Sequence, residues 1–410
     1  MNRDLLLLRP HPSKAISDAA MANSGLVNLS IGEASFGAPR KVLDAVRDAV
    51  STAETGARTF DHYANSRGTP ALRRAIARRY ERLYGLRIDP ETEVLVTYGA
   101  AEAIWLSVFT LTNAGDDVLM PDPHYVIYDG ITDSLGRRTV TMPTTAEAGF
   151  RIDAAQLAAA ITPASRLLIL NSPANPTGAM YGQPELQSIL EVARARGTTV
   201  LHDEVFDHIT FGEEHRPLAA FDPRLENTIV VNSVSKLFGM TGWRIGWMVA
   251  RREIIDLALK AHTYVSLAVP TLLQDAITGA VNDPAVDAEV ERNVAALQAR
   301  VARVARELES LGGFDFPDGL PRAGFYLFPR VTALAERLGM QNESSVSEAV
   351  TRFLMDECGV AVVPGNVYGR GGEGYIRLVI AAPDDVLDEA LSRIRGVLTH
   401  KPPVTDGIAP

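Results

Sequence analysis

Residues 233–244 read Ser-Val-Ser-Lys-Leu-Phe-Gly-Met-Thr-Gly-Trp-Arg, which is the most specific pattern in this sequence. They follow a β-rich run, 228–232, so Lys236 lies just past the carboxyl end of an expected strand. A lone lysine usually lies on the surface, but burial among apolar neighbours lowers the pKa of an amine and makes it a better nucleophile. Arg244, eight residues later, could bind a phosphate. The segment therefore suits an imine-forming amine beside a phosphate site.

Around this segment, short β-rich runs alternate with longer amphipathic segments, which is typical of an α/β fold. Continuous apolar strands separated by helices predict a mainly parallel sheet flanked by helices. After residue 282 a long Ala/Arg/Glu/Leu-rich segment predicts one helix that leads into a smaller α+β domain. The expected strands are 94–97, 117–120, 166–170, 198–202, 228–232, 324–328 and 375–380, and the expected helices include 184–195, 286–311 and 384–398.

These patterns divide the 410 residues into four expected parts. Residues 1–44 form an N-terminal arm and part of the small domain, and residues 45–285 form a large domain. Residues 286–400 form the small C-terminal domain. The Pro-rich, polar end, 401–410, is expected to be disordered.

The composition argues against several classes of function. The formal net charge of −10 disfavours binding to nucleic acids and to anionic membranes. The single cysteine, Cys358, excludes an internal disulfide and a multi-cysteine metal site, so we expect a cytoplasmic protein without a metal. The apolar run Leu5 to Leu8 is too short for a signal peptide or a membrane span.

Three other strand ends carry candidate site residues, because ligands of open α/β sheets bind at the carboxyl ends of the strands. Small residues at 99–101 begin a helix, where backbone N–H groups could bind a phosphate. Two prolines and a glycine around Asn175 indicate a rigid turn that could direct its amide into a cleft. Asp203 and Glu204 end an apolar run, and a buried carboxylate there should face a cation or a protonated nitrogen. Spacing does not separate these two acids, and each motif alone could be an ordinary turn or loop.

Taken together, these motifs resemble the fold-type I pyridoxal-phosphate (PLP) enzymes, and specifically the class I/II aminotransferases related to aspartate aminotransferase. The resemblance runs from about residue 27 to residue 394 and keeps the order and spacing of the motifs. It implies that the cofactor PLP (pyridoxal 5'-phosphate) binds in the 45–285 domain as a Schiff base with Lys236. It also implies that Asp203 pairs with the pyridine nitrogen and that Asn175 donates to the phenolic oxygen of the cofactor.

The same resemblance assigns the remaining site residues. Arg377 is expected to hold the α-carboxylate of the substrate, with Gly32 and Asn175 beside it. Tyr63 is expected to reach the phosphate in the neighbouring subunit, which implies a homodimer with shared active sites. Further cofactor contacts are implied for Gly99, Ala100, Ala101, Tyr125, Phe206, Ser233, Ser235 and Arg244.

The implied activity is transfer of an α-amino group between an amino acid and a 2-oxo acid by a ping-pong mechanism. A first alternative is a PLP-dependent lyase, cyclase or β/γ-replacement enzyme of the same fold. A second, which the intact Lys236 disfavours, is a non-catalytic module that only holds the cofactor. The sequence does not identify the donor amino acid.

Position 206 departs from the resemblance, which leads us to expect a tyrosine that donates to the phenolic oxygen of the cofactor. Phe206 has no hydroxyl, and the loss of that hydrogen bond should raise the pKa of the Lys236 Schiff base. Phe206 is therefore either a tolerated aromatic exchange or a sign of a different reaction.

Overall fold

Seven strands form one mostly parallel sheet, which confirms the predicted α/β fold. The computed structural model describes residues 8, 12–54, 60 and 62–400. The strands are β2 Val94–Thr97, β3 Asp117–Asp122, β4 Arg138–Pro143, β5 Ser165–Asn171, β6 Thr199–Asp203, β7 Thr228–Ser233 and β8 Gly246–Val249. Their order is β2-β8-β7-β6-β5-β3-β4, and only β8 runs antiparallel to its neighbours. The strands β4 and β8 are not among those predicted from the sequence.

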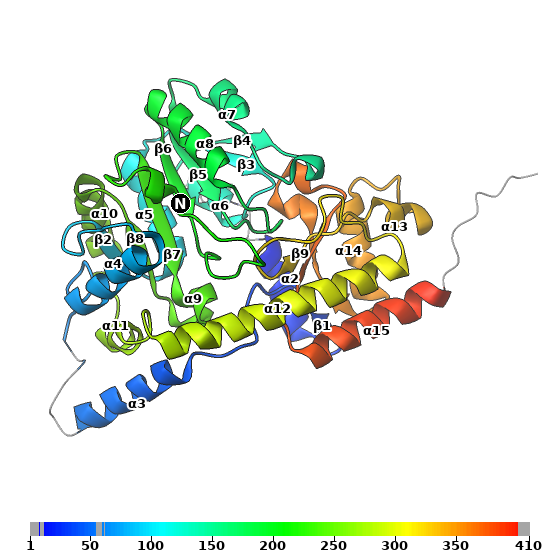
Figure 1. Ribbon diagram of the computed structural model, residues 1–410. Coiled ribbons are helices and arrows are strands. Elements are labelled where there is room, and N and C mark those ends of the chain that lie inside the picture. Colours follow the sequence, from blue (N-terminus) through cyan, green and yellow to red (C-terminus); the bar gives the residue numbers. More distant parts are fainter. Residues whose placement is uncertain (1–7, 9–11, 55–59, 61, 401–410) are drawn as a thin grey trace, which may run out of the picture.

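Helices cover both faces of this sheet (Figure 1). They are α4 Pro70–Tyr84, α5 Gly99–Leu111, α6 Ile127–Ser134, α7 Ala154–Ala160, α8 Gln183–Ala195, α9 Val234–Leu237, α10 Arg252–Val265 and α11 Thr271–Thr278, with short 3₁₀ turns η1 Ala146–Ala148, η2 Leu218–Phe221 and η3 Thr241–Trp243. Because neighbouring strand residues point to opposite faces, Leu95 packs with α5, α6 and α10. Val94 and Val96 pack on the other face with α4 and α11, and α7 and α8 extend that layer over β3, β5 and β6. Burial on both faces explains why the strands other than the edge strand β4 are mainly apolar in sequence.

A second hydrophobic cluster gathers the C-terminal elements and part of the N-terminal segment. The elements that contribute to it are β1 Val27–Asn28, β9 Tyr326–Leu327, α13 Thr332–Arg337, α14 Val346–Asp356, β10 Val360–Ala361, β12 Ile376–Val379 and α15 Asp384–His400. The same part of the chain also contains β11 Val363–Pro364 and the 3₁₀ turns η4 Gly365–Tyr368 and η5 Arg370–Gly372. The strand β1 pairs in parallel with β10, so the N-terminal segment joins this cluster. The helices α2 Pro12–Ala22 and α3 Arg40–Glu54 precede the large sheet in the chain.

One long helix, α12 Pro284–Leu311, connects the two clusters (Figure 1). Val286 and Val290 near its start pack in the cluster around α4 and α11. Val301 and Leu308 in its second half pack with β1 and α15. The division into domains at residues 44 and 285 remains our proposal, and this distribution of core residues supports it.

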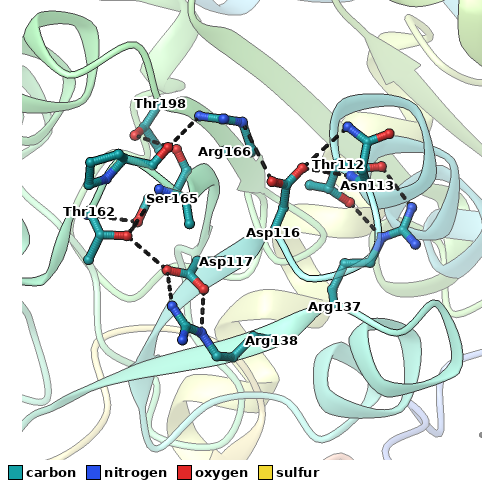
Figure 2. Close-up of polar contacts among 12 residues, drawn as sticks. Thr112, Asn113, Asp116, Asp117, Arg137, Arg138, Thr162, Ser165, Arg166 and Thr198 are labelled. Atoms are coloured by element: carbon teal, nitrogen blue, oxygen red, sulfur yellow. Dashed lines mark hydrogen bonds and ion pairs between the residues drawn. The ribbon is translucent and has the colours of Figure 1, made fainter.

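The amino ends of the strands are held by a network of charged and hydroxyl groups (Figure 2). Asp117, at the start of β3, is fully buried and accepts hydrogen bonds from Nε and Nη2 of Arg138 on β4, at 2.5 Å and 2.8 Å. The Thr162 hydroxyl, just before β5, donates to the same carboxylate at 3.0 Å. These bonds tie three strands together at the edge of the sheet opposite to the carboxyl ends.

Two further predictions concern the C-terminal residues and membrane spans. The predicted disorder of 401–410 concerns residues outside those that the structure describes. Within the described ranges, no helix is both long enough and apolar enough to cross a membrane.

Candidate active site

A cavity of about 680 Å³ lies at the carboxyl ends of β5, β6 and β7, where the strand-end motifs occur. Tyr326 on β9 and Arg377 on β12 complete its walls from the second cluster. All the predicted site residues except Gly99 and Tyr63 line this cavity: Gly32, Ala100, Ala101, Tyr125, Asn175, Asp203, Phe206, Ser233, Ser235, Lys236, Arg244 and Arg377. The fold therefore brings together residues that are spread over most of the chain.

Lys236 lies on the single turn α9, directly after β7. Its ammonium donates a hydrogen bond to the Gly32 carbonyl and lies 5.9 Å and 5.4 Å from the ring centroids of Phe206 and Phe325. Burial lowers the pKa of Lys236 to about 8, and the charge of Arg377 acts in the same direction. Roughly a tenth of this amine is therefore neutral and nucleophilic at pH 7, far more than for an ordinary lysine.

Asp203, the last residue of β6, is the acid that faces the cavity. It is 2% exposed, and it accepts hydrogen bonds from the Tyr128 hydroxyl at 2.7 Å and from the Val205 N–H at 3.3 Å. Burial raises the pKa of Asp203 to about 6, although the Tyr128 hydrogen bond opposes this shift. A carboxylate in such a place is stabilised by a positively charged partner, which fits a protonated ring nitrogen.

Glu204 does not line the cavity and is fully buried, so the two acids that spacing could not separate have different surroundings. Its carboxylate lies 2.6 Å from Nδ1 of His202 and 3.5 Å from Nε2 of His215. Among the described residues, these three form a group whose nitrogen and oxygen atoms lie close enough together to hold a metal ion. However, Nδ1 of His202 already accepts the Leu218 N–H at 3.1 Å, so the protein itself uses that atom. The expectation of no metal stays a prediction.

Arg377 presents a buried guanidinium to the cavity from β12. Its Nη2 donates to the Ser30 carbonyl at 2.6 Å, and its Nη1 donates to Oδ1 of Asn175 at 3.2 Å. The rings of Tyr326 and Tyr368 lie 4.5 Å and 5.2 Å from its central carbon. Its Nε has no hydrogen-bond partner among the described residues although it is buried. An arginine held in this way has donor capacity left for a carboxylate.

The turn after β5 is held in place by two asparagines. The Asn175 N–H donates to Oδ1 of Asn171 at 2.7 Å, and Nδ2 of Asn171 donates to the Asp203 carbonyl at 3.0 Å. The Asn175 oxygen accepts from Arg377, which leaves its amide hydrogens as donors to the cavity. The predicted rigid turn is thus fastened to the neighbouring strand β6.

The start of α5 lies beside the segment 233–244, since Nη2 of Arg244 donates to the Tyr98 carbonyl at 3.5 Å. Arg244 has a left-handed backbone, with φ of 54°, and its Nη1 donates to the Thr241 carbonyl at 2.9 Å. A side chain at Gly99 would come within 2.6 Å of the Arg244 guanidinium, so only glycine lets the two approach. The side chain of Tyr98, the residue before α5, caps none of the helix N–H groups, although the Glu102 carboxylate accepts from the Tyr98 N–H at 2.6 Å. Ser233 and Ser235 line the cavity near this end. Uncapped N–H groups, two hydroxyls and an arginine suit a phosphate.

Aromatic rings form a further wall of the cavity. Tyr125 lies edge-on to Tyr128, with 5.7 Å between ring centroids. Phe206 packs edge-on against Phe325 and Tyr326, at 5.3 Å and 5.7 Å. Position 206 therefore keeps an aromatic ring in the wall but offers no hydroxyl. The sequence analysis did not assign Tyr128 to the site, because its partner Asp203 lies 75 residues away in the chain.

Tyr63 is far more exposed than the other predicted site residues, at 89%, and does not line the cavity. A tyrosine that served its own active site would lie against it. The exposure is compatible with the expected contribution to a neighbouring subunit, which stays a prediction.

Comparison with known proteins gives the family. The family model described as "Aminotransferase class I and II" matches residues 24–394. An aspartate aminotransferase from Pyrococcus abyssi is 31% identical over 98% of this chain and 99% of its own length. An aromatic-amino-acid aminotransferase from Thermococcus litoralis is 30% identical over 97% of this chain and 98% of its own.

The fold comparison agrees. The structure of N-succinyldiaminopimelate aminotransferase from Mycobacterium tuberculosis matches with a TM-score of 0.87 and 34% identity, over 97% of this chain and all of that chain. The match extends over both hydrophobic clusters and the cavity between them. The protein therefore belongs to the class I and II aminotransferase family and is an aminotransferase, an enzyme that transfers amino groups.

Proposed function

We propose that the cavity binds PLP, the cofactor of this family, covalently through Lys236, and that the enzyme exchanges an α-amino group between an amino acid and a 2-oxo acid. One observation carries the proposal: an amine with a pKa of about 8 lies in a cavity that also holds an anion site and the Arg377 guanidinium. When bound, PLP supplies a conjugated ring that takes up the electron pair left when the substrate Cα loses its proton.

The donors and acceptors of the cavity fit this cofactor. The N-terminus of α5, Ser233, Ser235 and Arg244 suit its phosphate. The buried carboxylate of Asp203 suits a protonated pyridine nitrogen, because the positive charge of that nitrogen stabilises a carboxylate that burial alone would destabilise. The Asn175 amide can donate to the phenolic oxygen, because its own oxygen is already engaged.

Two groups then act on the substrate, and a third holds one of them in place. Arg377 binds the α-carboxylate and so fixes the orientation of Cα. Once the substrate amino group had displaced it from the cofactor, Nζ of Lys236 would be free to remove the proton from Cα and to return a proton on the same side. The Gly32 carbonyl, which accepts from Lys236, keeps that amine near the reacting atoms. Over both half-reactions, one amino acid and one 2-oxo acid become the other 2-oxo acid and amino acid, with no external oxidant.

We also propose a homodimer that works in the cytoplasm. The exposed Tyr63 supports sharing of sites between subunits. A chain with one cysteine, Cys358, cannot use an internal disulfide, which suits a reducing compartment.

The test is the absorption spectrum of the full chain loaded with PLP. We expect the band of the Lys236-bound cofactor to disappear when a donor amino acid is added and to return when a 2-oxo acid follows. Loss of the band with release of ammonia, and no return with any 2-oxo acid, would favour the lyase or cyclase reaction instead.

Lys236→Ala is the matched variant. It should not become covalently labelled by PLP after borohydride reduction, whereas Lys260→Ala, on helix α10, should label like the wild type. Labelling of the Lys236→Ala protein at the same stoichiometry would contradict the proposal.

A further inference from the structure

Two aromatic rings pack against the guanidinium of Arg377, and they come from the two neighbours of its strand. The central carbon of Arg377 lies 4.5 Å from the ring centroid of Tyr326 and 5.2 Å from that of Tyr368. Tyr326 is on β9, which pairs with one edge of β12. Tyr368 ends the turn η4, which follows β11 on the other edge of β12, and it is fully buried. Because Tyr368 lies outside the strands, other contacts must fix its ring.

The segment 365–374, which carries Tyr368, is attached to the large sheet at the end of β3. The Gly371 N–H donates to Oδ1 of Asp122, the last residue of β3, at 2.9 Å. Two residues later, the His124 N–H donates to the Tyr368 carbonyl at 2.8 Å. Both Asp122 and His124 are buried, and hydrogen bonds shielded from water are stronger than exposed ones. The backbone of Tyr368 is therefore tied to a strand of the large sheet.

This close contact depends on glycine at two positions. Gly369 has a φ of 118°, and a side chain there would overlap the Asp122 carboxylate. A side chain at Gly371 would come within 2.7 Å of the Asp122 carbonyl oxygen. Glycine lets the backbone of the segment 365–374 lie directly on the end of β3. A run of four glycines among six residues, 369–374, thus serves close packing.

The far end of the segment 365–374 is attached to the start of α14. The Glu373 carboxylate accepts from the Ser345 hydroxyl at 2.8 Å and from the Ser347 N–H at 3.1 Å. The Ser347 hydroxyl in turn accepts from the Gly374 N–H at 2.8 Å. The segment therefore bridges β3 and α14, and it carries Tyr368 between these two attachments.

We propose that Asp122 and Tyr368 are positioning residues for substrate binding. Asp122 holds the segment 365–374 on β3, and the segment holds the Tyr368 ring against the guanidinium of Arg377. A guanidinium fixed in this way loses little freedom when it binds a carboxylate, and the ring adds a cation–π contact. This inference rests on the proposed function, in which Arg377 binds the α-carboxylate of the substrate.

The test is the first half-reaction of the PLP-loaded enzyme, followed by the loss of its absorption band, with the fastest-reacting donor from a panel of the protein amino acids. Tyr368→Leu should raise the apparent Kd of this donor about tenfold and leave the affinity for PLP unchanged. Tyr368→Phe should stay near the wild type, because the Tyr368 hydroxyl has no hydrogen-bond partner among the described residues. An apparent Kd in Tyr368→Leu within about threefold of the wild type would overturn the inference.

A control variant separates positioning from a general loss of packing. Phe150→Leu removes an aromatic ring from the same hydrophobic cluster, where Phe150 packs edge-on against Phe328 and Tyr375. It should leave the apparent Kd of the donor unchanged, and an equal rise in this variant would overturn the role of Tyr368. A wild-type enzyme that reacts with no amino acid would instead overturn the proposed function, and this inference with it.

A second pair of variants tests Asp122. Asp122→Ala removes the acceptor of the Gly371 N–H and should raise the apparent Kd of the donor about fivefold. Asp122→Asn keeps an oxygen that can accept this hydrogen bond, so it should bind the donor like the wild type. Unchanged donor binding in Asp122→Ala, or equally weak binding in both variants, would overturn the assignment of this role to the hydrogen bond.

Discussion

The carboxylate of Asp203 carries a functional charge but is buried, and burial destabilises the charged form. In the apoprotein, burial raises its pKa from 3.8 to about 6, so the folded state binds a proton more strongly than the unfolded chain. Its contribution to the free energy of unfolding must then fall as pH rises from about 4 to about 6, by roughly 3 kcal/mol at most. Urea unfolding of the wild-type and Asp203→Asn apoproteins across this range should show that fall in their difference. A difference independent of pH would contradict the assigned burial.

Phe206 offers a second test at the level of one residue. Phe206→Tyr places a hydroxyl on a ring that already lies 2% exposed in the cavity wall. If that hydroxyl donates to the phenolic oxygen of PLP, it should lower the pKa of the Lys236 Schiff base by about one to two, because it stabilises the deprotonated form. Titration of the absorption spectrum measures this value. The control Phe109→Tyr, at a position 46% exposed, should leave this pKa unchanged. An unchanged pKa in Phe206→Tyr would mean that the ring points away from the cofactor.

The limits of sequence reasoning are clearest at the pair Asp203 and Glu204. Strand alternation puts the two acids on opposite sides, but which side faces the site depends on partners that are distant in the chain. Tyr128 marks the cavity side, and His215 marks the other. Lys236, in contrast, could be predicted because its whole local pattern lies within twelve residues.

At the level of elements, continuous apolar runs predicted their strands to within two residues. The run at 94–97 coincides with β2, and the run at 117–120 is the first part of β3, which continues to Asp122. The missed strand β4 lies at the edge of the sheet with mostly exposed or half-buried residues, so it has no apolar run to read. The missed strand β8 has only four residues and begins at Gly246.

The buried acid at the start of β3 sets a stability prediction for the sheet. Asp117→Asn removes the charge that accepts two hydrogen bonds from Arg138, although Arg138 itself remains 64% exposed. We expect the free energy of unfolding to fall by about 1–3 kcal/mol, since bonds to a buried charged acceptor are lost. Chemical denaturation measures this change. The control Glu214→Gln, which breaks a surface pair with Arg216, should leave the free energy of unfolding unchanged. An equal loss of stability in both variants would contradict the role of the network.

For the whole molecule, the resemblance in motif order predicted the family, and the matched range 24–394 agrees with the expected 27 to 394. What the sequence could not supply is the packing of distant segments. Arg377 and Asn175 are 202 residues apart and meet only because β12 faces the turn after β5. The same holds for the contact between Lys236 and Gly32.

The proposed dimer is the last property of the whole molecule that can be tested. Large apolar side chains are exposed at the end of α10, with Tyr264 at 92% and Val265 at 64%, and we expect them to lie in the dimer interface. The segment that carries Tyr63 is tied to the same helix by the ion pair of Arg67 with Asp256, at 2.6 Å. Val265→Glu should therefore raise the Kd of the dimer at least about tenfold in sedimentation experiments and weaken PLP binding with it. Tyr63→Phe should weaken PLP binding but keep the dimer, because it removes only the hydroxyl expected at the partner's phosphate. A Val265→Glu protein that stays dimeric, or a monomer that binds PLP as tightly as the wild type, would contradict sharing of active sites between subunits.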